Sequence, residues 1–254
     1  MTHILLTRPL EASQQLADEL VTLGLSPIVM PLYGFSRCEP GPEIHSAWSA
    51  NMARRLAVFS SPRAVQFGLS HIPPDQFENL EFVVIGSATR ALLESSGHKV
   101  HWQAPGGLTS EDLLQMPELQ SNPGVAILFG APGGRKTLAE GLGEFGWALV
   151  PAMVYERVPL KPDVGQLEIL DDAGDVLSVW TSTSAIELAR EYLPEPVWNK
   201  ILGSPVLVVS SRIQAHFQQL GATFVELAEG PGNPELLRSI KRLSGPGART
   251  GTRI

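Results

Sequence analysis

The feature that most constrains the fold of this chain is a junction that its sequence contains twice. One copy reads LAVFSSPRAV (56–65) and the other reads LSVWTSTSAI (177–186). In each copy a short apolar run ends in hydroxyl residues directly before a segment with helical periodicity, which predicts a buried strand followed by a helix. The copies lie roughly 120 residues apart, a spacing that suggests an internal repeat.

The repeat extends over most of the chain. The segments VVIGSATRALLESSGHKV (83–100) and LVVSSRIQAHFQQLGATFVEL (207–227) each contain an apolar run, a polar turn, a helix that ends at a glycine, and a second short strand. Towards the N-terminal side, HILLTRP and SPIVMPLYGFSR correspond to VAILFGAP and ALVPAMVYERV. Because these matches keep nearly the same spacing, the chain is predicted to hold two copies of one pattern.

This pattern predicts an α/β fold of two similar domains, each a parallel sheet flanked by helices. The runs VVIG, AILFG and LVVSS do not alternate between apolar and polar residues, as expected for strands buried on both faces. Two divisions of the chain are compatible with the repeat. The domains could be sequential and split near Pro123. Alternatively, PLYGFSR and PAMVYERVPL, which each begin with proline, could be paired connectors, so that the first strand-helix-strand joins the C-terminal half.

Composition narrows the class of protein. The chain has 254 residues, 43% of them hydrophobic, and a formal net charge of −7, which argues against nucleic acid as a partner. It contains no run of roughly 20 apolar residues and no secretory segment, so we expect a cytoplasmic protein without a membrane partner. A single cysteine, Cys38, excludes an internal disulfide, and the histidines lack metal-ligand spacing. We therefore expect no metal site. No apolar heptad repeat demands association, so a monomer is expected.

Hydroxyl residues, glycines and arginines follow almost every predicted strand. Ligands of open parallel sheets bind beyond the carboxyl ends of the strands, so these residues are the candidate binding set. The candidates are Arg8, Ser60, Ser61, Arg63, Ser87, Thr89, Gly130, Arg135, Thr181, Ser182, Ser184, Ser210 and Ser211. Any one serine or threonine there is most simply a helix N-cap. Their repetition beside arginines favours an anionic ligand at helix N-termini.

Two nucleotide-binding motifs and the nucleophile elbow of hydrolases are absent or incomplete. The segment GAPGGRKT (130–137) resembles a phosphate-binding P-loop, but Arg135 occupies the position of its second glycine. No GxGxxG follows a strand, and no GxSxG elbow is present. A site rich in hydroxyls and poor in bases can hold and orient a reactive substrate, but it offers little for nucleophilic catalysis.

The segments HILLTRP, VFSSPRAV, VVIGSATRALLESSGHKV, TSEDLL, VYERVP and WTSTSAIE, in this order, resemble the uroporphyrinogen-III synthase family from about residue 3 to residue 240. The resemblance implies two α/β domains joined by a two-stranded β-ladder, with the substrate in the cleft between them. The implied first domain is 1–33 with 160–245 and the second is 40–150. Segments 34–39 and 151–159 would be the connectors, and 246–254 a flexible tail.

The resemblance also implies an activity. The family takes hydroxymethylbilane, a linear tetrapyrrole with eight carboxylates, expels its terminal hydroxyl as water, and closes the ring with inversion of the last pyrrole. It is a lyase of heme biosynthesis that uses no metal and no organic cofactor. Tyr155, in VYER, matches the position that would donate a proton to the leaving hydroxyl; the alternative interpretation is a tyrosine that packs between domains. Thr89, in GSAT, matches another family hydroxyl, and Ser61, Ser182 and Ser184 match positions lining the cleft. Arg8 and Arg63 would meet substrate carboxylates.

One segment departs from the family. Many members carry a G-P-x-T turn after the penultimate strand of the C-terminal half, where this chain has VSSRI (209–213). Either Ser210 or Ser211 replaces that threonine, or the contact is dispensable. Two other functions remain open on the sequence: a non-catalytic two-lobed cytoplasmic protein that binds an anionic small molecule, and a nucleotide-dependent enzyme that uses GAPGGRKT, which Arg135 disfavours.

Overall fold

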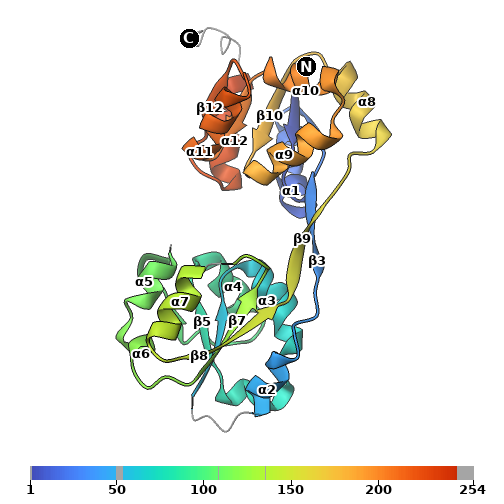
Figure 1. The fold of residues 1–254 in the computed structure, drawn as a ribbon. Coiled ribbons are helices and arrows are strands. Elements are labelled where there is room, and N and C mark those ends of the chain that lie inside the picture. Colours follow the sequence, from blue (N-terminus) through green and yellow to red (C-terminus); the bar gives the residue numbers. More distant parts are fainter. Residues whose placement is uncertain (1, 50–53, 108, 135, 245–254) are drawn as a thin grey trace. The chain divides into compact units, whose positions relative to one another are not determined.

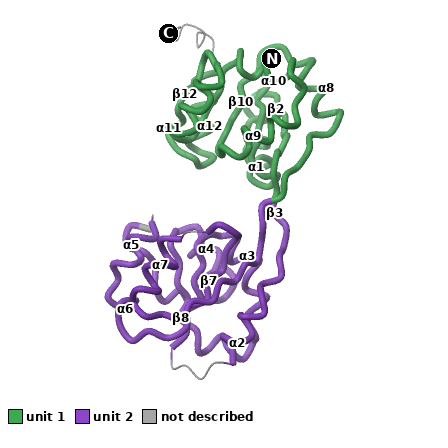
Figure 2. The backbone as a smooth tube through the Cα atoms, in the orientation of Figure 1, with its two compact units in different colours: residues 1–34, 158–254 green, residues 35–157 purple. Residues whose placement is uncertain are grey.

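The computed structural model describes residues 2–49, 54–107, 109–134 and 136–244. The chain divides into two compact units (Figure 2), of which unit 1 comprises residues 1–34 with 158–254 and unit 2 comprises residues 35–157. Pro123 lies well inside unit 2, so the alternative of two sequential domains split near that residue is wrong. Two predicted features, the tail 246–254 and the side chain of Arg135, lie outside the described residues.

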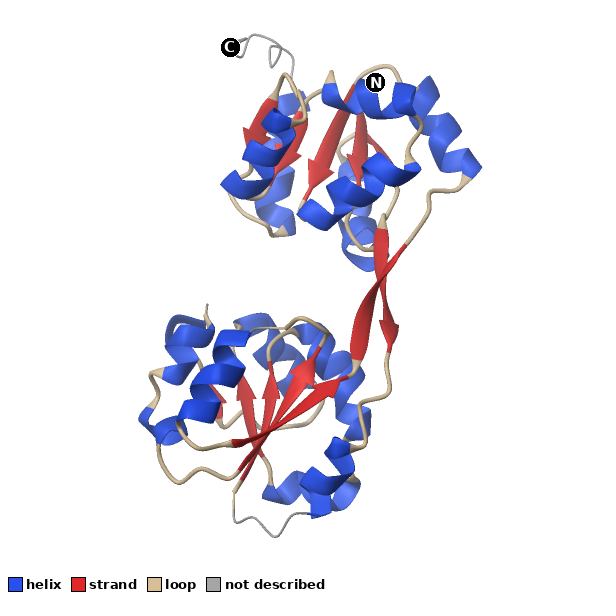
Figure 3. Ribbon diagram, viewed as in Figure 1, coloured by secondary structure: helices blue, strands red, loops and turns tan. Residues whose placement is uncertain are grey.

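Unit 1 is built on a five-stranded sheet in which neighbouring strands are parallel. In spatial order its strands are β12 (Val225–Leu227), β11 (Val206–Val208), β10 (Val176–Trp180), β1 (His3–Leu6) and β2 (Ser26–Val29). Its helices are α1 (Leu10–Thr22), α8 (Val164–Asp172), α9 (Thr183–Tyr192), α10 (Glu195–Leu202), α11 (Ser211–Gln219) and α12 (Asn233–Ser244). Figure 3 shows helices on both faces of the sheet, the arrangement expected for parallel strands.

Unit 2 repeats this architecture. In spatial order the strands of its five-stranded parallel sheet are β6 (Trp102–Gln103), β5 (Glu81–Val84), β4 (Arg55–Phe59), β7 (Val125–Gly130) and β8 (Ala148–Met153). Its α-helices are α2 (Glu43–Ser49), α3 (Pro62–Gly68), α4 (Ser87–Ser95), α5 (Ser110–Leu114), α6 (Pro117–Gln120) and α7 (Lys136–Glu144). Short 3₁₀ turns are η1 (Leu69–His71), η2 (Pro74–Asn79) and η3 (Pro105–Gly107).

The two sheets have the same order once the repeat is taken into account. Strands β4, β5 and β6 of the first copy correspond to β10, β11 and β12 of the second, and β1 and β2 correspond to β7 and β8. Each sheet therefore combines three strands from one copy with two from the other. The predicted fold class, two similar parallel sheets flanked by helices, is confirmed, and β1-α1-β2 completes the sheet of the C-terminal half.

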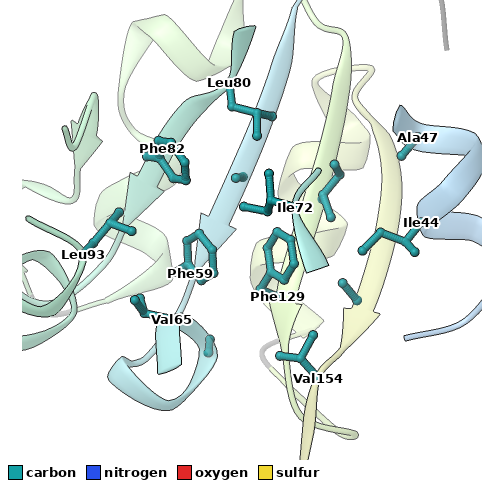
Figure 4. Packing of buried hydrophobic residues seen from close by; sticks show 14 of the residues in the cluster. Ile44, Ala47, Phe59, Val65, Ile72, Leu80, Phe82, Leu93, Phe129 and Val154 are labelled. Atoms are coloured by element: carbon teal, nitrogen blue, oxygen red, sulfur yellow. The ribbon is translucent and has the colours of Figure 1, made fainter. Parts of the chain in front are cut away.

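The strands of unit 2 bury both faces, as their continuous apolar sequences predict. Ala57 and Phe59 of β4 face helices α2, α3 and α4, whereas Leu56 and Val58 face α5, α6 and α7. Figure 4 shows the first face, where the rings of Phe59 and Phe129 stack with their centroids 4.7 Å apart. Full burial of a side chain of this size contributes about 1.5–3 kcal/mol. This core fixes the carboxyl ends of β4 and β7 relative to each other.

Unit 1 has two corresponding apolar layers. On one face of the sheet, Leu16 and Leu20 of α1 and Leu236 of α12 pack against β1 and β10. On the other face, the fully buried ring of Trp180 makes edge contacts with Trp198 of α10 and Phe217 of α11. These layers hold the ends of β1 and β10 side by side.

The chain passes between the units through β3 (Tyr33–Arg37) and β9 (Tyr155–Pro159), which pair as a two-stranded sheet (Figure 1). At one end Cys38 N–H donates to Val154 O, and at the other Leu160 N–H donates to Leu32 O. The residue numbers run in opposite directions, so the strands are antiparallel. The predicted two-stranded β-ladder is therefore present.

One part of the predicted connectors is wrong. Residues 151–153 do not lie outside the sheets, because β8 extends through them and Pro151 pairs with Leu128 of β7. The reason is the position of β8 at the edge of the sheet. Ala148 and Val154 donate their N–H groups towards β7, so the nitrogen of the odd-numbered Pro151 points to the open edge, where no donor is needed.

Candidate functional site

Each sheet has one point at which the chain reverses its direction of progress across the strands. In unit 2 the chain leaves β4 towards β5 on one side and leaves β7 towards β8 on the other. In unit 1 the equivalent point lies between β10 and β1. Ligands of open α/β sheets bind beyond the carboxyl ends of the strands at such switch points. Several predicted site residues follow these four strands directly.

The switch point of unit 2 carries three of the predicted residues. Ser60 and Ser61 follow β4, and Gly130 is the last residue of β7. A Cβ atom placed on Gly130 would lie 3.9 Å from Oγ of Ser60, so the Ser60 hydroxyl stands beside the end of the neighbouring strand. This contact is consistent with the expectation that the segments after β4 and β7 meet at the carboxyl ends of the strands.

Tyr155, the predicted proton donor, contacts the residues that follow the carboxyl end of β4. It is the first residue of β9, and its phenol oxygen lies 3.1 Å from Oγ of Ser61, a hydrogen bond in which either group can donate. Ser61 is also the N-cap of α3 and accepts the backbone N–H of Ala64 at 3.2 Å. Ser61 is therefore an N-cap, and the same side chain also contacts Tyr155.

Aromatic and cationic side chains surround the phenol. The Tyr155 ring meets Phe35 edge-on at a centroid distance of 5.7 Å and lies nearly parallel to Phe67 at 5.8 Å. The guanidinium of Arg63 lies 5.0 Å from the centre of the Phe35 ring and that of Arg157 lies 6.0 Å from it. These contacts hold the phenol in one orientation and place positive charge nearby, as an anionic ligand requires.

Two other predicted residues of unit 2 lie further from this switch point. Ser87 and Thr89 begin α4, after β5, which is the next strand out from β4. Ser87 is exposed, whereas Thr89 is only 2% exposed. Arg63 donates a hydrogen bond from Nη1 to Oε1 of Gln66 at 2.6 Å.

The switch point of unit 1 has a similar set of groups. Thr181 and Ser182 follow β10, and the hydroxyl oxygens of Ser182 and Ser184 lie 2.6 Å apart. Ser182 is the N-cap residue of α9 but forms no side-chain cap bond. Thr7, which follows β1, is 1% exposed and donates to the carbonyl of Val179 at 2.9 Å. That bond ties β1 to β10, so the role of Thr7 is structural.

Arg8 follows Thr7 after β1, and its surroundings are unusual. Its Nη1 donates to Oδ1 of Asn233, the first residue of α12, at 2.7 Å. Burial lowers the pKa of the Arg8 guanidinium, an effect that nearby Tyr33 partly opposes. Among the described residues Arg8 has no carboxylate partner. A half-buried guanidinium without a counter-ion is suited to bind an anion.

The remaining two candidates follow β11, one strand away from the switch point of unit 1. Ser210 is the N-cap of α11 and accepts the N–H of Ile213 at 3.4 Å, and Ser211 is the exposed first residue of that helix. The structure thus supports the cap interpretation for Ser210. Within the described ranges, His, Cys, Asp and Glu side chains form no group of three or more that could hold a metal ion. No helix in that part of the chain has the length and apolar character needed to cross a membrane.

Phe35, Phe67 and Asn233 are among the contact residues of these sites that are not predicted from the sequence. The signal for Asn233 is the segment GPGNPE (230–235), in which asparagine before proline marks a helix start. Phe35 and Phe67 have no such signal, because single phenylalanines in a strand and a helix most simply belong to the core.

Comparison with known proteins gives consistent matches over nearly the whole chain. The family model for uroporphyrinogen-III synthase HemD matches residues 14–238. The uroporphyrinogen-III synthase of Escherichia coli (strain K12) is 29% identical over 246 residues, covering 94% of this chain and 99% of the relative. That of Salmonella typhimurium (strain LT2) is 28% identical with the same coverage.

Two solved structures share the fold of this chain. The uroporphyrinogen-III synthetase of Helicobacter pylori 26695 gives a TM-score of 0.62 at 17% identity, with coverage of 94% of this chain and 100% of that one. A mutant uroporphyrinogen III synthase of the extremely thermophilic bacterium Thermus thermophilus gives a TM-score of 0.54 at 19% identity, covering 95% and 98% of the two chains.

Proposed function

The chain belongs to the uroporphyrinogen-III synthase family, and from that membership we propose that it converts hydroxymethylbilane into uroporphyrinogen III. In this reaction the linear tetrapyrrole loses its terminal hydroxyl as water and closes into a ring with its last pyrrole inverted. The protein would thus be a cyclising hydro-lyase of heme biosynthesis. We further propose that it works in the cytoplasm as a monomer and needs no metal or organic cofactor.

The chemistry asks the protein for a proton donor and for control of conformation. The C–O bond of the pyrrolic CH₂OH group breaks with electron density supplied by the pyrrole nitrogen, and the oxygen takes a proton and leaves as water. The carbon left behind is electrophilic and is attacked by the last pyrrole at its substituted α-carbon, which then carries two bridging carbons. The original bridge bond at that carbon breaks, and the released bridge bonds to the free α-carbon of the same ring. That carbon loses its proton, which balances the proton taken up by the leaving oxygen, and the ring is inverted. A donor near the leaving oxygen contributes about 10²–10⁴-fold to such a step. Orientation of the last pyrrole then decides which isomer forms.

The observation that carries the proposal is the hydrogen bond between Tyr155 and Ser61 at the switch point of unit 2. Ser61 already accepts the Ala64 N–H, and its own hydroxyl hydrogen is available to point at the phenol oxygen. In that arrangement the Tyr155 proton is directed away from Ser61 and can be donated to the leaving hydroxyl. We assign Tyr155 as the general acid on this basis.

Substrate carboxylates are anionic, and the chain itself has a net charge of −7, so their binding needs positive charge placed locally at the site. We propose that Arg8 and Arg63 bind carboxylates, since each stands at a switch point and Arg63 lies beside the aromatic contacts of Tyr155. The hydroxyls of Ser60, Thr181, Ser182 and Ser184 would add hydrogen bonds at the same strand ends. Ser87, Thr89, Gly130, Arg135, Ser210 and Ser211 complete the proposed binding set.

Identification of the product isomer tests this function. Hydroxymethylbilane closes without an enzyme to the type I isomer, so the purified protein should redirect the product to type III, as seen by chromatography of the oxidised porphyrins. The rate of type III formation should scale with protein concentration. If only type I appears, at the rate seen in buffer, the protein is not a synthase. Tight binding of hydroxymethylbilane without turnover would instead favour a non-catalytic binding protein.

A further inference from the structure

Arg8 differs from Arg54, another half-buried arginine of this protein, in what it contacts. In unit 2, the guanidinium of Arg54 donates two hydrogen bonds to the carboxylate of Glu81, at 2.7 and 2.8 Å, and two more to backbone carbonyls. Arg8 has one side-chain partner, Oδ1 of Asn233 at 2.7 Å, and forms no ion pair with any residue that the structure describes. Its positive charge is therefore held by a neutral amide.

This difference has a physical consequence. A buried charge is stabilised when a counter-ion or a full set of hydrogen bonds replaces the water that it loses. The carboxylate of Glu81 does so for Arg54, whose pKa is raised by that hydrogen bond, whereas burial lowers the pKa of Arg8. A guanidinium has several N–H donors in a rigid fork, and Asn233 accepts from one nitrogen. The arrangement leaves Arg8 with the capacity to bind a carboxylate in addition to Asn233.

The contact also fixes where the guanidinium lies. Arg8 directly follows Thr7, whose hydroxyl is tied to the carbonyl of Val179 in β10, so the backbone of this segment is anchored at the switch point. Asn233, at the start of α12, then holds the far end of the Arg8 side chain. A long side chain that is fixed at both ends loses little conformational entropy when it binds a ligand.

We propose that Asn233 is a positioning residue that holds Arg8 to bind one carboxylate of the tetrapyrrole substrate. This inference rests on the proposed function and extends it by a residue outside the predicted site. A neutral acceptor is essential to the role, because asparagine orients the guanidinium without neutralising it. An aspartate in its place would supply the carboxylate that the substrate is meant to supply.

The substitution Asn233→Asp separates this role from a purely structural tie between β1 and α12. The side chain keeps its size, and its hydrogen bond to Arg8 becomes an ion pair. If the contact is only structural, the variant keeps the wild-type KM for hydroxymethylbilane. If Arg8 binds substrate, the internal carboxylate competes, and KM rises about 10- to 100-fold while kcat stays within about threefold of wild type.

Two further variants complete the test. Asn199→Asp introduces the same charge at an exposed position of α10 and should leave KM unchanged. Arg8→Gln should raise KM to a similar extent as Asn233→Asp, and the double variant should be no worse than either single variant. Thermal unfolding of each protein shows whether a variant is folded at the assay temperature. If Asn233→Asp does not fold, Asn233→Ser, which keeps a short acceptor, should show a smaller rise in KM than Arg8→Gln.

The outcomes separate this inference from the proposed function. If the wild-type protein forms the type III isomer and folded Asn233→Asp has an unchanged KM, Asn233 and Arg8 form a structural tie and the inference is wrong. If the wild-type protein forms no type III isomer, the proposed function fails instead. A fall in kcat at constant KM would also contradict the proposed role, because a carboxylate anchor acts on binding.

Discussion

Replacement of Tyr155 by phenylalanine removes one oxygen atom and leaves the ring. The contacts of that ring with Phe35 and Phe67, each worth about 0.5–1.5 kcal/mol, are retained. The hydrogen bond to Ser61 is lost, which lowers the free energy of unfolding by about 0.5–1.5 kcal/mol. For domains of this size we expect a fall of about 2–8 °C in Tm.

The effect on turnover should be much larger. Loss of a general acid lowers the rate about 10²–10⁴-fold, and we expect kcat of Tyr155→Phe to fall at least tenfold while KM changes by less than about threefold. The small loss of stability cannot produce this result. A protein with an unfolding free energy of about 5–15 kcal/mol stays almost fully folded after it loses about 1 kcal/mol. Steady-state formation of the type III isomer and a thermal melt on the same sample measure both quantities.

Tyr192→Phe is the matched control. Tyr192 lies at the end of α9, and its ring contacts the ammonium group of Lys161 at 5.4 Å, so the same atom is removed far from the switch point along the chain. Its kcat should equal that of wild type. If kcat of Tyr155→Phe lies within twofold of wild type, Tyr155 is a packing residue and the general-acid assignment is refuted.

Three further tests probe local contacts by substitution. Ser61→Ala removes both the cap of α3 and the partner of Tyr155. We expect the unfolding free energy measured with denaturant to fall by about 0.5–2 kcal/mol, and kcat to fall less than in Tyr155→Phe. A kcat equal to wild type would exclude the assigned hydrogen-bond direction. The hydrogen bond from Arg54 lowers the pKa of Glu81, so the stability from this pair is present above about pH 4.3 and is lost as pH falls through the lower native pKa. The fall in unfolding free energy between about pH 6 and pH 3 should therefore be smaller in Glu81→Gln than in wild type, and an equal fall would refute this linkage. Gly68→Ala would bring a Cβ to 2.8 Å from the Phe129 ring and should destabilise unit 2 by about 1–3 kcal/mol, whereas Gly143→Ala, whose nearest neighbour would be 3.6 Å away, should be neutral or stabilising in the same melt.

The fold is largely predictable from the sequence because the repeat and the strand patterns agree. Uninterrupted apolar runs such as AILFG predict strands buried on both faces, and their carboxyl ends then have to carry the polar turns. The exchange of β1-α1-β2 between halves cannot be derived from those patterns alone, since either arrangement buries the same residues. Pro151 shows a second limit: a proline is compatible with an edge strand when its nitrogen points outward, and only the hydrogen-bond register decides this.

The candidate sites are predictable in place but not in detail. The rule that ligands bind at strand ends directs attention to Ser61 and Arg8, which do lie at the two switch points. It does not reveal that Ser61 both caps a helix and contacts Tyr155, or that Arg8 meets Asn233, because those contacts join residues 94 and 225 positions apart. Such pairs depend on how the sheets are completed, which local sequence does not encode.

The product isomer formed by metal-free protein decides whether this chain is a uroporphyrinogen-III synthase that needs no metal or cofactor. Purified protein, dialysed against a chelator and freed of small molecules, should be mixed with hydroxymethylbilane and its porphyrin products separated after oxidation. We expect the type III isomer to dominate, at a rate proportional to protein concentration and unchanged by the chelator. Formation of type I alone, or of type III only after a metal or cofactor is restored, would contradict the proposed function and its chemistry.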